Sequence, residues 1–294
     1  MVSAVAADLF DVEPGFGLDM AVLAGLTAVF SVSVSMGLDK GIKRLSDLNA
    51  VLAIVLLVFV LLAGPTAFII NHATDSLGVM LQNYITMSLR TGVAEGSSFS
   101  ADYTVFYWAW WTAWAPFMGL FVARISGGRT MKSTILGCVV GGSLGCWAGF
   151  AILGNTALNL RLTEYQPMVE LMSVTAASDV DGPLAVVTLL QSLPMSGVVF
   201  AVFFVLSFIF VATSLDSAAF TLAATASKDL PNDGQPARWH RLMWAFVLGG
   251  MAVALMSLGG IKALQAASVV VGLPVLIVMG LAAFSLMRWL RDHD

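Results

Sequence analysis

Seven apolar stretches, each about twenty residues long, decide what this chain of 294 residues can fold into. A helix needs about 20 mostly apolar residues to cross the hydrocarbon core of a membrane. Only 11% of the residues are charged, whereas soluble domains average about 25%. The sequence therefore predicts an all-α integral membrane protein that lies in a lipid bilayer. The predicted spans cover about 19–36, 50–71, 103–124, 133–155, 196–226, 239–258 and 263–288.

The lysines and arginines predict how the chain is oriented, because these residues gather in cytoplasmic loops. If the seven spans alternate, only Arg90, Arg161 and Lys262 fall on the outer side. We therefore expect a multi-pass protein with a cytoplasmic C-terminus. The basic residues on the inner side are Lys40, Lys43, Arg44, Arg124, Arg129, Lys132, Lys228, Arg238, Arg241, Arg288 and Arg291.

Three segments between the spans have a character of their own. Residues 76–90 place apolar side chains on one helical face and polar ones on the other, which predicts an amphipathic helix along the outer surface. Residues 156–195 are expected to form an outer loop with helical stretches. Residues 37–49 (GLDKGIKRLSDLN) are expected to form a short polar connector on the inner side.

The third stretch, 103–124, is unusually aromatic. On a helix, one stripe of it carries Tyr103, Phe106, Trp110, Trp114, Phe117 and Phe121, and Trp111 flanks this stripe. The rings either pack in the core or form a box for a quaternary ammonium, whose charge is attracted to ring faces. Pro116 favours the box, because its missing N–H frees the carbonyl of Thr112 and loosens the helix. Trp108 points to the other side, and we assign it to packing.

The fifth stretch contains the segment FVATSLDS, residues 210–217, with two adjacent hydroxyls, Thr213 and Ser214. Each hydroxyl either bonds back to the carbonyl four residues earlier, Ile209 or Phe210, or contributes to a site for a hard cation such as Na⁺. Asp216 is the one clear acid inside a predicted span. A buried acid is costly in a membrane, so this side chain has either a structural partner or a direct role in transport.

Other classes of function find little support. No basic patch has the density that nucleic-acid binding needs. The spans hold no paired carboxylates, histidine cluster or nucleophile–base pair, so an embedded enzyme is not expected. The sequence predicts no bound cofactor; the one ion that we expect is a coupling ion such as Na⁺.

Several motifs together resemble the betaine/choline/carnitine transporter (BCCT) family. They are GLDKGIKRLSDLN, the break AGPT, FYWAWWTAWAPFMGLFVARISGGRT, FAILGN and TSLDSA. They occur in this order along nearly the whole chain. The resemblance implies a leucine-transporter-type fold of twelve spans, ten of which form two inverted five-helix repeats.

On this resemblance the chain corresponds to spans six to twelve. Residues 1–71 would end the first repeat, 72–102 would hold the outer amphipathic helix and loop, and 103–294 would form the second repeat. The acidic, loop-like start of the chain (MVSAVAADLFDVE) agrees with this reading. We therefore expect a C-terminal portion of such a transporter.

The family likeness also implies roles for particular residues. Trp110, Trp111 and Trp114 match the box for a trimethylammonium group, and Phe121 matches a residue on the inner side of the substrate path. Tyr103 stands where many members have another Trp. Phe117 continues the aromatic stripe, and Met118 stands where sodium-independent carnitine exchangers carry a methionine near the substrate. The backbone of Phe210 with the hydroxyls of Thr213 and Ser214 matches half of a sodium site.

The expected function is secondary active transport of a quaternary-ammonium compound of the glycine betaine, carnitine or choline type across the inner (plasma) membrane. We expect Na⁺ to be the coupling ion. Two alternatives stay open, a Na⁺-independent exchanger of the carnitine/butyrobetaine type and an inactive C-terminal fragment. The resemblance also implies a homotrimer.

Overall fold

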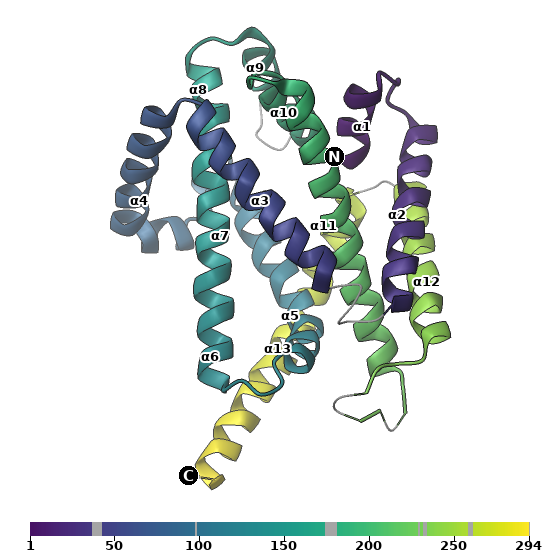
Figure 1. The fold of residues 1–294 in the computed structure, drawn as a ribbon. Coiled ribbons are helices and arrows are strands. Elements are labelled where there is room, and N and C mark those ends of the chain that lie inside the picture. Colours follow the sequence, from purple (N-terminus) through teal and green to yellow (C-terminus); the bar gives the residue numbers. More distant parts are fainter. Residues whose placement is uncertain are drawn as a thin grey trace. The chain divides into compact units, whose positions relative to one another are not determined.

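The chain is helical throughout in the computed structural model (Figure 1). The structure describes residues 1–36, 43–97, 99–173, 181–228, 230–231, 234–257 and 261–293. No strand is present among these residues, so the predicted all-α fold is confirmed. Parts of four predicted segments lie outside the described residues, namely 37–42 of the inner connector, 98 of the outer helix and loop, 174–180 of the outer loop and 258 of the sixth span.

The chain divides into two compact units. The first contains Met1–Tyr84 and Gly128–Gly249, and the second contains Ile85–Gly127 and Gly250–Asp294. Both units are therefore built from segments that are distant in the sequence. The predicted division at residues 71 and 102 refers to membrane repeats, and it stays a prediction.

Helix α11 (Ser196–Thr225) is the centre of the first unit. It packs against α1 (Val2–Phe10), α2 (Phe16–Met36), α3 (Lys43–Ala63) and α10 (Gly182–Gln191). One buried apolar cluster joins it to α1, α3 and α10 through Val5, Leu56, Val60, Leu190, Val199 and Phe200. A second cluster joins it to α2 and to α12 (Arg238–Ser257) through Leu26, Phe30, Ala212, Ala219 and Ala245. Alanines at facing positions let membrane helices approach closely.

A sharp break separates α3 from α4 (Thr66–Leu89) at Gly64 and Pro65. A Cβ at position 64 would lie 2.6 Å from the carbonyl oxygen of Val60, so only glycine fits there. Pro65 has no N–H to continue the first helix, and its carbonyl accepts the Ile69 N–H at 2.9 Å as the next helix begins. The predicted second span, 50–71, ends in this Gly64-Pro65 break, and α3 ends just before it at Ala63. The predicted surface helix 76–90 is the later part of α4, which begins ten residues earlier than expected.

An unbroken helical rod covers residues 131–162 and extends beyond the predicted 133–155. Two of its turns, Gly137–Gly141 and Phe150–Gly154, have the wider π-helical pattern. Single π-helical turns inside α-helices often occur at functional sites. The α-helical parts of the rod are α6 (Met131–Leu136), α7 (Gly142–Gly149) and α8 (Asn155–Leu162).

The outer loop after the rod contains α9 (Gln166–Leu171) as well as α10. The Asp181 side chain begins α10 by accepting the Leu184 N–H at 3.1 Å, a standard N-cap interaction. The helical stretches predicted for 156–195 are therefore present in the described part of that loop.

The second unit is built on the packing of α5 (Phe106–Ile125) against α13 (Ile261–His293). Their backbones approach closely where Gly272 meets Ala109, because a Cβ at Gly272 would lie 3.1 Å from the Ala109 carbonyl oxygen. Each helix contains an internal proline, Pro116 in α5 and Pro274 in α13. A short π-helical segment, Ser100–Val105, leads into α5.

Five helical segments within the described residues are long and apolar enough to cross a membrane. Two other predicted spans, α5 and α12, are helices of 20 residues each, which corresponds to a length of about 30 Å. They are less apolar because α5 is rich in indole rings and α12 begins with Arg238, His240 and Arg241. The total of seven spans stays a prediction. The five segments are Phe16–Ser33, Lys43–Ala63, Met131–Leu162, Ser196–Thr225 and Leu264–Asp292.

Candidate functional site

Three aromatic rings form a column along α5. The ring centroids of Trp111 and Trp114 lie 6.5 Å apart, and those of Trp114 and Phe117 lie 6.3 Å apart with the two planes nearly parallel at 10°. Residues three apart on a helix are neighbours on its surface, and these separations are typical of interacting aromatic pairs. We call Trp111, Trp114 and Phe117 the ring column.

Much of the ring column is open. Trp111 is 62% exposed and Trp114 is 38% exposed within the chain, while Phe117 is half-buried. Buried packing rings would have both faces covered by neighbouring side chains. The open faces of Trp111 and Trp114 are therefore available to a ligand, and the face of an indole ring attracts cations.

Trp110, the third predicted tryptophan, has a different neighbour. Its ring packs edge-on against Phe106 at 5.1 Å, and Phe106 is only 6% exposed. Adjacent helical residues point about 100° apart, so Trp110 and Trp111 do not share one face. The predicted set of three tryptophans therefore divides in the structure into the ring column and a separate Phe106–Trp110 pair.

The other predicted substrate residues lie along the same helical segment. Tyr103 is half-buried and stacks on Phe99 with centroids 4.8 Å apart. Met118 and Phe121 are both half-buried on α5. Trp108, which the sequence places away from the box, is 71% exposed and is the most exposed tryptophan of α5.

Pro116 lies between Trp114 and Phe117, within the ring column. Since proline has no N–H, the carbonyl of Thr112 has no helical donor four residues later. This carbonyl therefore lacks the usual donor of the helix and lies within the span of the ring column. Rings and a carbonyl oxygen are the groups that attract a cation without a carboxylate.

The predicted oxygen ligands of α11 meet at one backbone carbonyl. The Phe210 carbonyl oxygen accepts hydrogen bonds from Thr213 Oγ1 at 3.1 Å and from Ser214 Oγ at 2.9 Å. The expected partner of Thr213, Ile209, is corrected to Phe210, because the hydroxyl bonds three residues back rather than four. Thr213 is buried and Ser214 is exposed. We call these three oxygens the oxygen trio.

The geometry of the oxygen trio is compatible with both interpretations from the sequence. Back-bonding hydroxyls are common inside helices, and each hydroxyl oxygen keeps lone pairs for a cation. In the part of the chain that the structure describes, no group of three or more His, Cys, Asp or Glu side chains gathers around a point. Neutral oxygens of this kind suit a hard monovalent ion rather than a transition metal.

Asp216 lies one turn after the oxygen trio and is fully buried, with 0% exposure. Within the described ranges, neither of its carboxylate oxygens has a hydrogen-bond partner. It lies well inside α11, so it does not cap a helix end. A cap is therefore not its role, and the polar side chain beside its carboxyl in the described residues is the buried Ser33 of α2.

A pair of side chains that the sequence did not single out joins α8 to the start of α4. Asn155 is buried, its Oδ1 lies 2.9 Å from His72 Nδ1, and its Nδ2 donates to the Ile69 carbonyl at 3.5 Å. Ser76 Oγ lies 3.2 Å from the same His72 nitrogen. The available signal was an amide at the end of an apolar span, in the motif FAILGN. This contact positions helices and carries no reaction.

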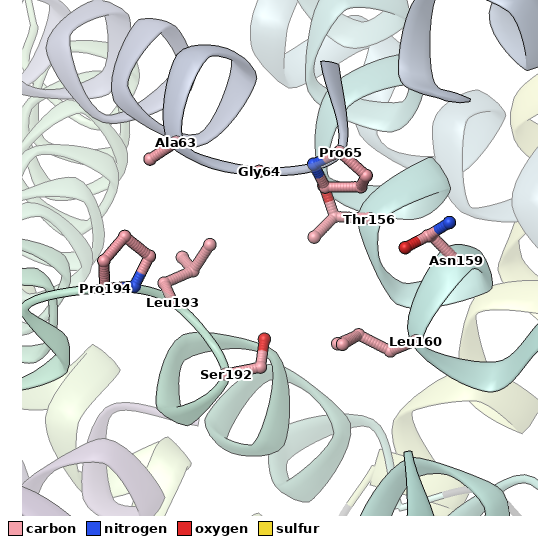
Figure 2. Close-up of a pocket in the computed structure, with 9 residues that line it drawn as sticks. All are labelled: Ala63, Gly64, Pro65, Thr156, Asn159, Leu160, Ser192, Leu193 and Pro194. Carbon is pink, nitrogen blue, oxygen red and sulfur yellow. The ribbon is translucent and has the colours of Figure 1, made fainter. Parts of the chain in front are cut away.

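A small cavity of about 180 Å³ opens beside the break between α3 and α4. Figure 2 shows side chains from three segments around this hollow. The Thr156 and Ser192 hydroxyls in its wall donate back to their own helices, each at 2.7 Å. The cavity has no charged lining, so the ring column and the oxygen trio remain the candidate sites. The lining residues are Ala63, Gly64, Pro65, Thr156, Asn159, Leu160, Ser192, Leu193 and Pro194.

Together these features define an all-α, multi-pass membrane protein with an open aromatic column and a set of neutral oxygens. Comparison with known families gives a match over the whole chain. The family described as "BCCT, betaine/carnitine/choline family transporter" matches residues 1–294, and the chain belongs to this family. The resemblance noted in the sequence is thus confirmed, and the family is one of transporters, not enzymes.

Individual relatives support the same assignment. The chain is 35% identical over 288 residues to the ectoine/hydroxyectoine transporter of Virgibacillus pantothenticus, covering 97% of this chain and 55% of that protein. It is 34% identical over 285 residues to a glycine betaine transporter of Acinetobacter baylyi, covering 96% and 42%. It is 36% identical over 289 residues to the glycine betaine transporter OpuD of Bacillus subtilis, covering 97% and 54%. The chain spans about half the length of these relatives.

Proposed function

We propose that this protein takes part in the secondary active transport of a small quaternary-ammonium compound of the glycine betaine, carnitine or choline type. The observation that carries the proposal is the open ring column of α5, with Trp111 62% and Trp114 38% exposed. A trimethylammonium group has no hydrogen to donate, so aromatic faces bind it better than hydrogen-bond acceptors do. The names of the relatives agree with solutes of this kind, and one relative is named for ectoine.

The coupling ion in this proposal is Na⁺, held in part by the oxygen trio of α11. The support is chemical: two hydroxyl oxygens lie within hydrogen-bonding distance of one carbonyl oxygen. Such oxygens are hard ligands, which alkali cations prefer. A Na⁺-independent exchanger is the competing form of transport. The half-buried Met118, one turn after Trp114, is the residue that favours this alternative.

The same proposal includes the cellular setting. We expect the protein in the inner (plasma) membrane with its C-terminus in the cytoplasm, because the basic residues favour that side. We also expect a homotrimer, on family likeness. Cysteine labelling from each side of the membrane at introduced sites in the last turn of α13 tests the orientation.

Uptake by the host cell tests the function directly. Membrane vesicles from a strain with the gene deleted are compared with vesicles from the same strain with the gene restored. We expect labelled glycine betaine, carnitine or choline to accumulate only with the gene, and an imposed Na⁺ gradient to drive accumulation. Ectoine is tested in parallel. Equal accumulation of all four solutes in both strains would contradict transport and favour an inactive fragment. Accumulation that needs a counter-substrate but not Na⁺ would favour exchange.

A further inference from the structure

The contact between α2 and α11 contains Asp216, an acid to which the proposed function gives no role. Along α11, the positions facing α2 carry Ala212, Asp216 and Ala219, all with 0% exposure. On α2 the facing surface includes Phe30 and the buried Ser33, whose hydroxyl lies beside the Asp216 carboxyl. The acid is therefore enclosed by apolar groups and one hydroxyl.

This arrangement does nothing for stability. A buried carboxylate is costly unless it is paired or hydrogen-bonded, and among the residues described here neither Asp216 oxygen has a hydrogen bond. The Ser33 hydroxyl lies beside the carboxyl, but the geometry between the two groups falls short of a hydrogen bond. An alanine, like those on both sides of Asp216, would fill the interface at lower cost. The carboxyl therefore needs a reason other than packing.

The position of Asp216 supplies that reason. It lies three residues after Thr213, so the two side chains are neighbours on the helix surface, and both are buried. The oxygen trio is neutral, and a cation held by neutral oxygens in an apolar interior keeps an uncompensated charge. An ionised carboxylate one turn away compensates for that charge, and the bound cation in turn favours the ionised form, because Coulomb attraction is strong where the effective dielectric constant is low.

We infer that Asp216 is a positioning residue that supplies the counter-charge for a monovalent cation at the oxygen trio, without being one of its ligands. The inference rests on the proposed Na⁺ coupling, and it explains how neutral oxygens could bind Na⁺ with useful affinity. Ser33 then holds the orientation of the carboxyl, since it is the polar side chain that α2 presents to it.

The test is the Na⁺ concentration that gives half-maximal uptake in the restored host-cell vesicles. Asp216→Asn keeps the shape and removes the charge. We expect the half-activating Na⁺ concentration to rise about tenfold or more, while the KM for the solute at saturating Na⁺ stays within about twofold. Asp75→Asn is the matched control, because it removes one acid from an exposed position on α4, and we expect no change.

Folding is followed separately. Thermal unfolding of the purified Asp216→Asn protein should occur at the same temperature as in the wild type or higher, because an unpaired buried charge is removed. Ser33→Ala is a second variant, expected to raise the half-activating Na⁺ concentration by about twofold to threefold through a less ordered carboxyl.

The outcomes are distinguishable. Na⁺-dependent uptake with an unchanged Na⁺ requirement in Asp216→Asn would overturn the counter-charge and leave Na⁺ coupling standing. An unchanged Na⁺ requirement together with loss of the response to a pH gradient would identify Asp216 as a proton acceptor instead. Wild-type uptake that ignores Na⁺ would overturn the coupling and this inference together. A large fall in unfolding temperature for Asp216→Asn would show a structural role and overturn it as well.

Discussion

Helices α5 and α11 both carry candidate binding groups inside apolar stretches, but the rings of α5 are uncovered whereas the hydroxyls of α11 already have hydrogen-bond partners. The ring column of α5 has open faces that its own helix cannot cover. The hydroxyls of α11 are already bonded, since Thr213 and Ser214 both donate to the Phe210 carbonyl. A stacked set of open rings can attract a cation without other groups, whereas a hydroxyl that is already hydrogen-bonded binds a cation well only if a nearby negative charge favours it.

The comparison predicts that neighbouring rings on α5 have separate roles, one structural and one in binding. Phe106 is buried, so Phe106→Ala should lower the free energy of unfolding by about 3 kcal/mol through the cavity that it leaves. Solute affinity per folded molecule should stay unchanged. Chemical unfolding in detergent and solute binding measured on the same sample check this. Weakened solute binding with an unchanged free energy of unfolding would contradict the structural role and show that Phe106 belongs to the binding surface.

Trp114 is the central ring of the column, and its loss should affect binding instead. Trp114→Ala should raise the KM for the transported solute about 5- to 30-fold, since one desolvated ring contributes about 1–2 kcal/mol to holding a cation. Trp114→Phe should recover most of the affinity. Trp108→Ala is the control on the same helix, because Trp108 is 71% exposed and lies outside the ring column; its effect should stay within about twofold. Equal effects of both alanine variants would argue that the tryptophans of α5 only anchor the helix.

The hydroxyls of α11 should show a smaller and different effect. Ser214→Ala removes one oxygen of the trio, and we expect the half-activating Na⁺ concentration to rise about fivefold, as the loss of one ligand worth about 1 kcal/mol implies. Ser207→Ala is matched to it, because the Ser207 hydroxyl also bonds back, to the Phe204 carbonyl at 3.1 Å. A shift of the same size in Ser207→Ala would show that back-bonding alone accounts for both.

The sequence predicted much of the fold because apolar length is a strong signal. Helices near each of the seven predicted spans are present. The motif AGPT predicted the break between α3 and α4 through its glycine and proline, although the apolar pattern itself continues through Pro65 to residue 71. The close approach at Gly64, 2.6 Å from a Cβ position to the Val60 oxygen, depends on backbone geometry that the sequence does not display.

The candidate site was predictable in its residue types but less so in its geometry. Rare side chains such as Trp110, Trp111 and Trp114 stand out in any apolar stretch. Their division into two ring sets follows from the ring contacts, Trp110 with Phe106 and Trp111 with Trp114, because helical spacing alone puts Trp110 and Trp114 on one stripe. The isolation of Asp216 was not predictable, because it depends on which side chains α2 brings to α11.

The central claim is that the ring column binds a positive charge and not merely a bulky apolar group. Glycine betaine and 3,3-dimethylbutanoate test it most directly, since they share one shape and differ in whether nitrogen or carbon carries the three methyl groups. Competition for solute uptake is measured in the restored host-cell vesicles, in the wild type and in Trp114→Ala. We expect glycine betaine to compete in the wild type, and 3,3-dimethylbutanoate to fail at about a hundredfold higher concentration. Comparable competition by the two compounds would contradict the claim, because shape alone would then account for binding.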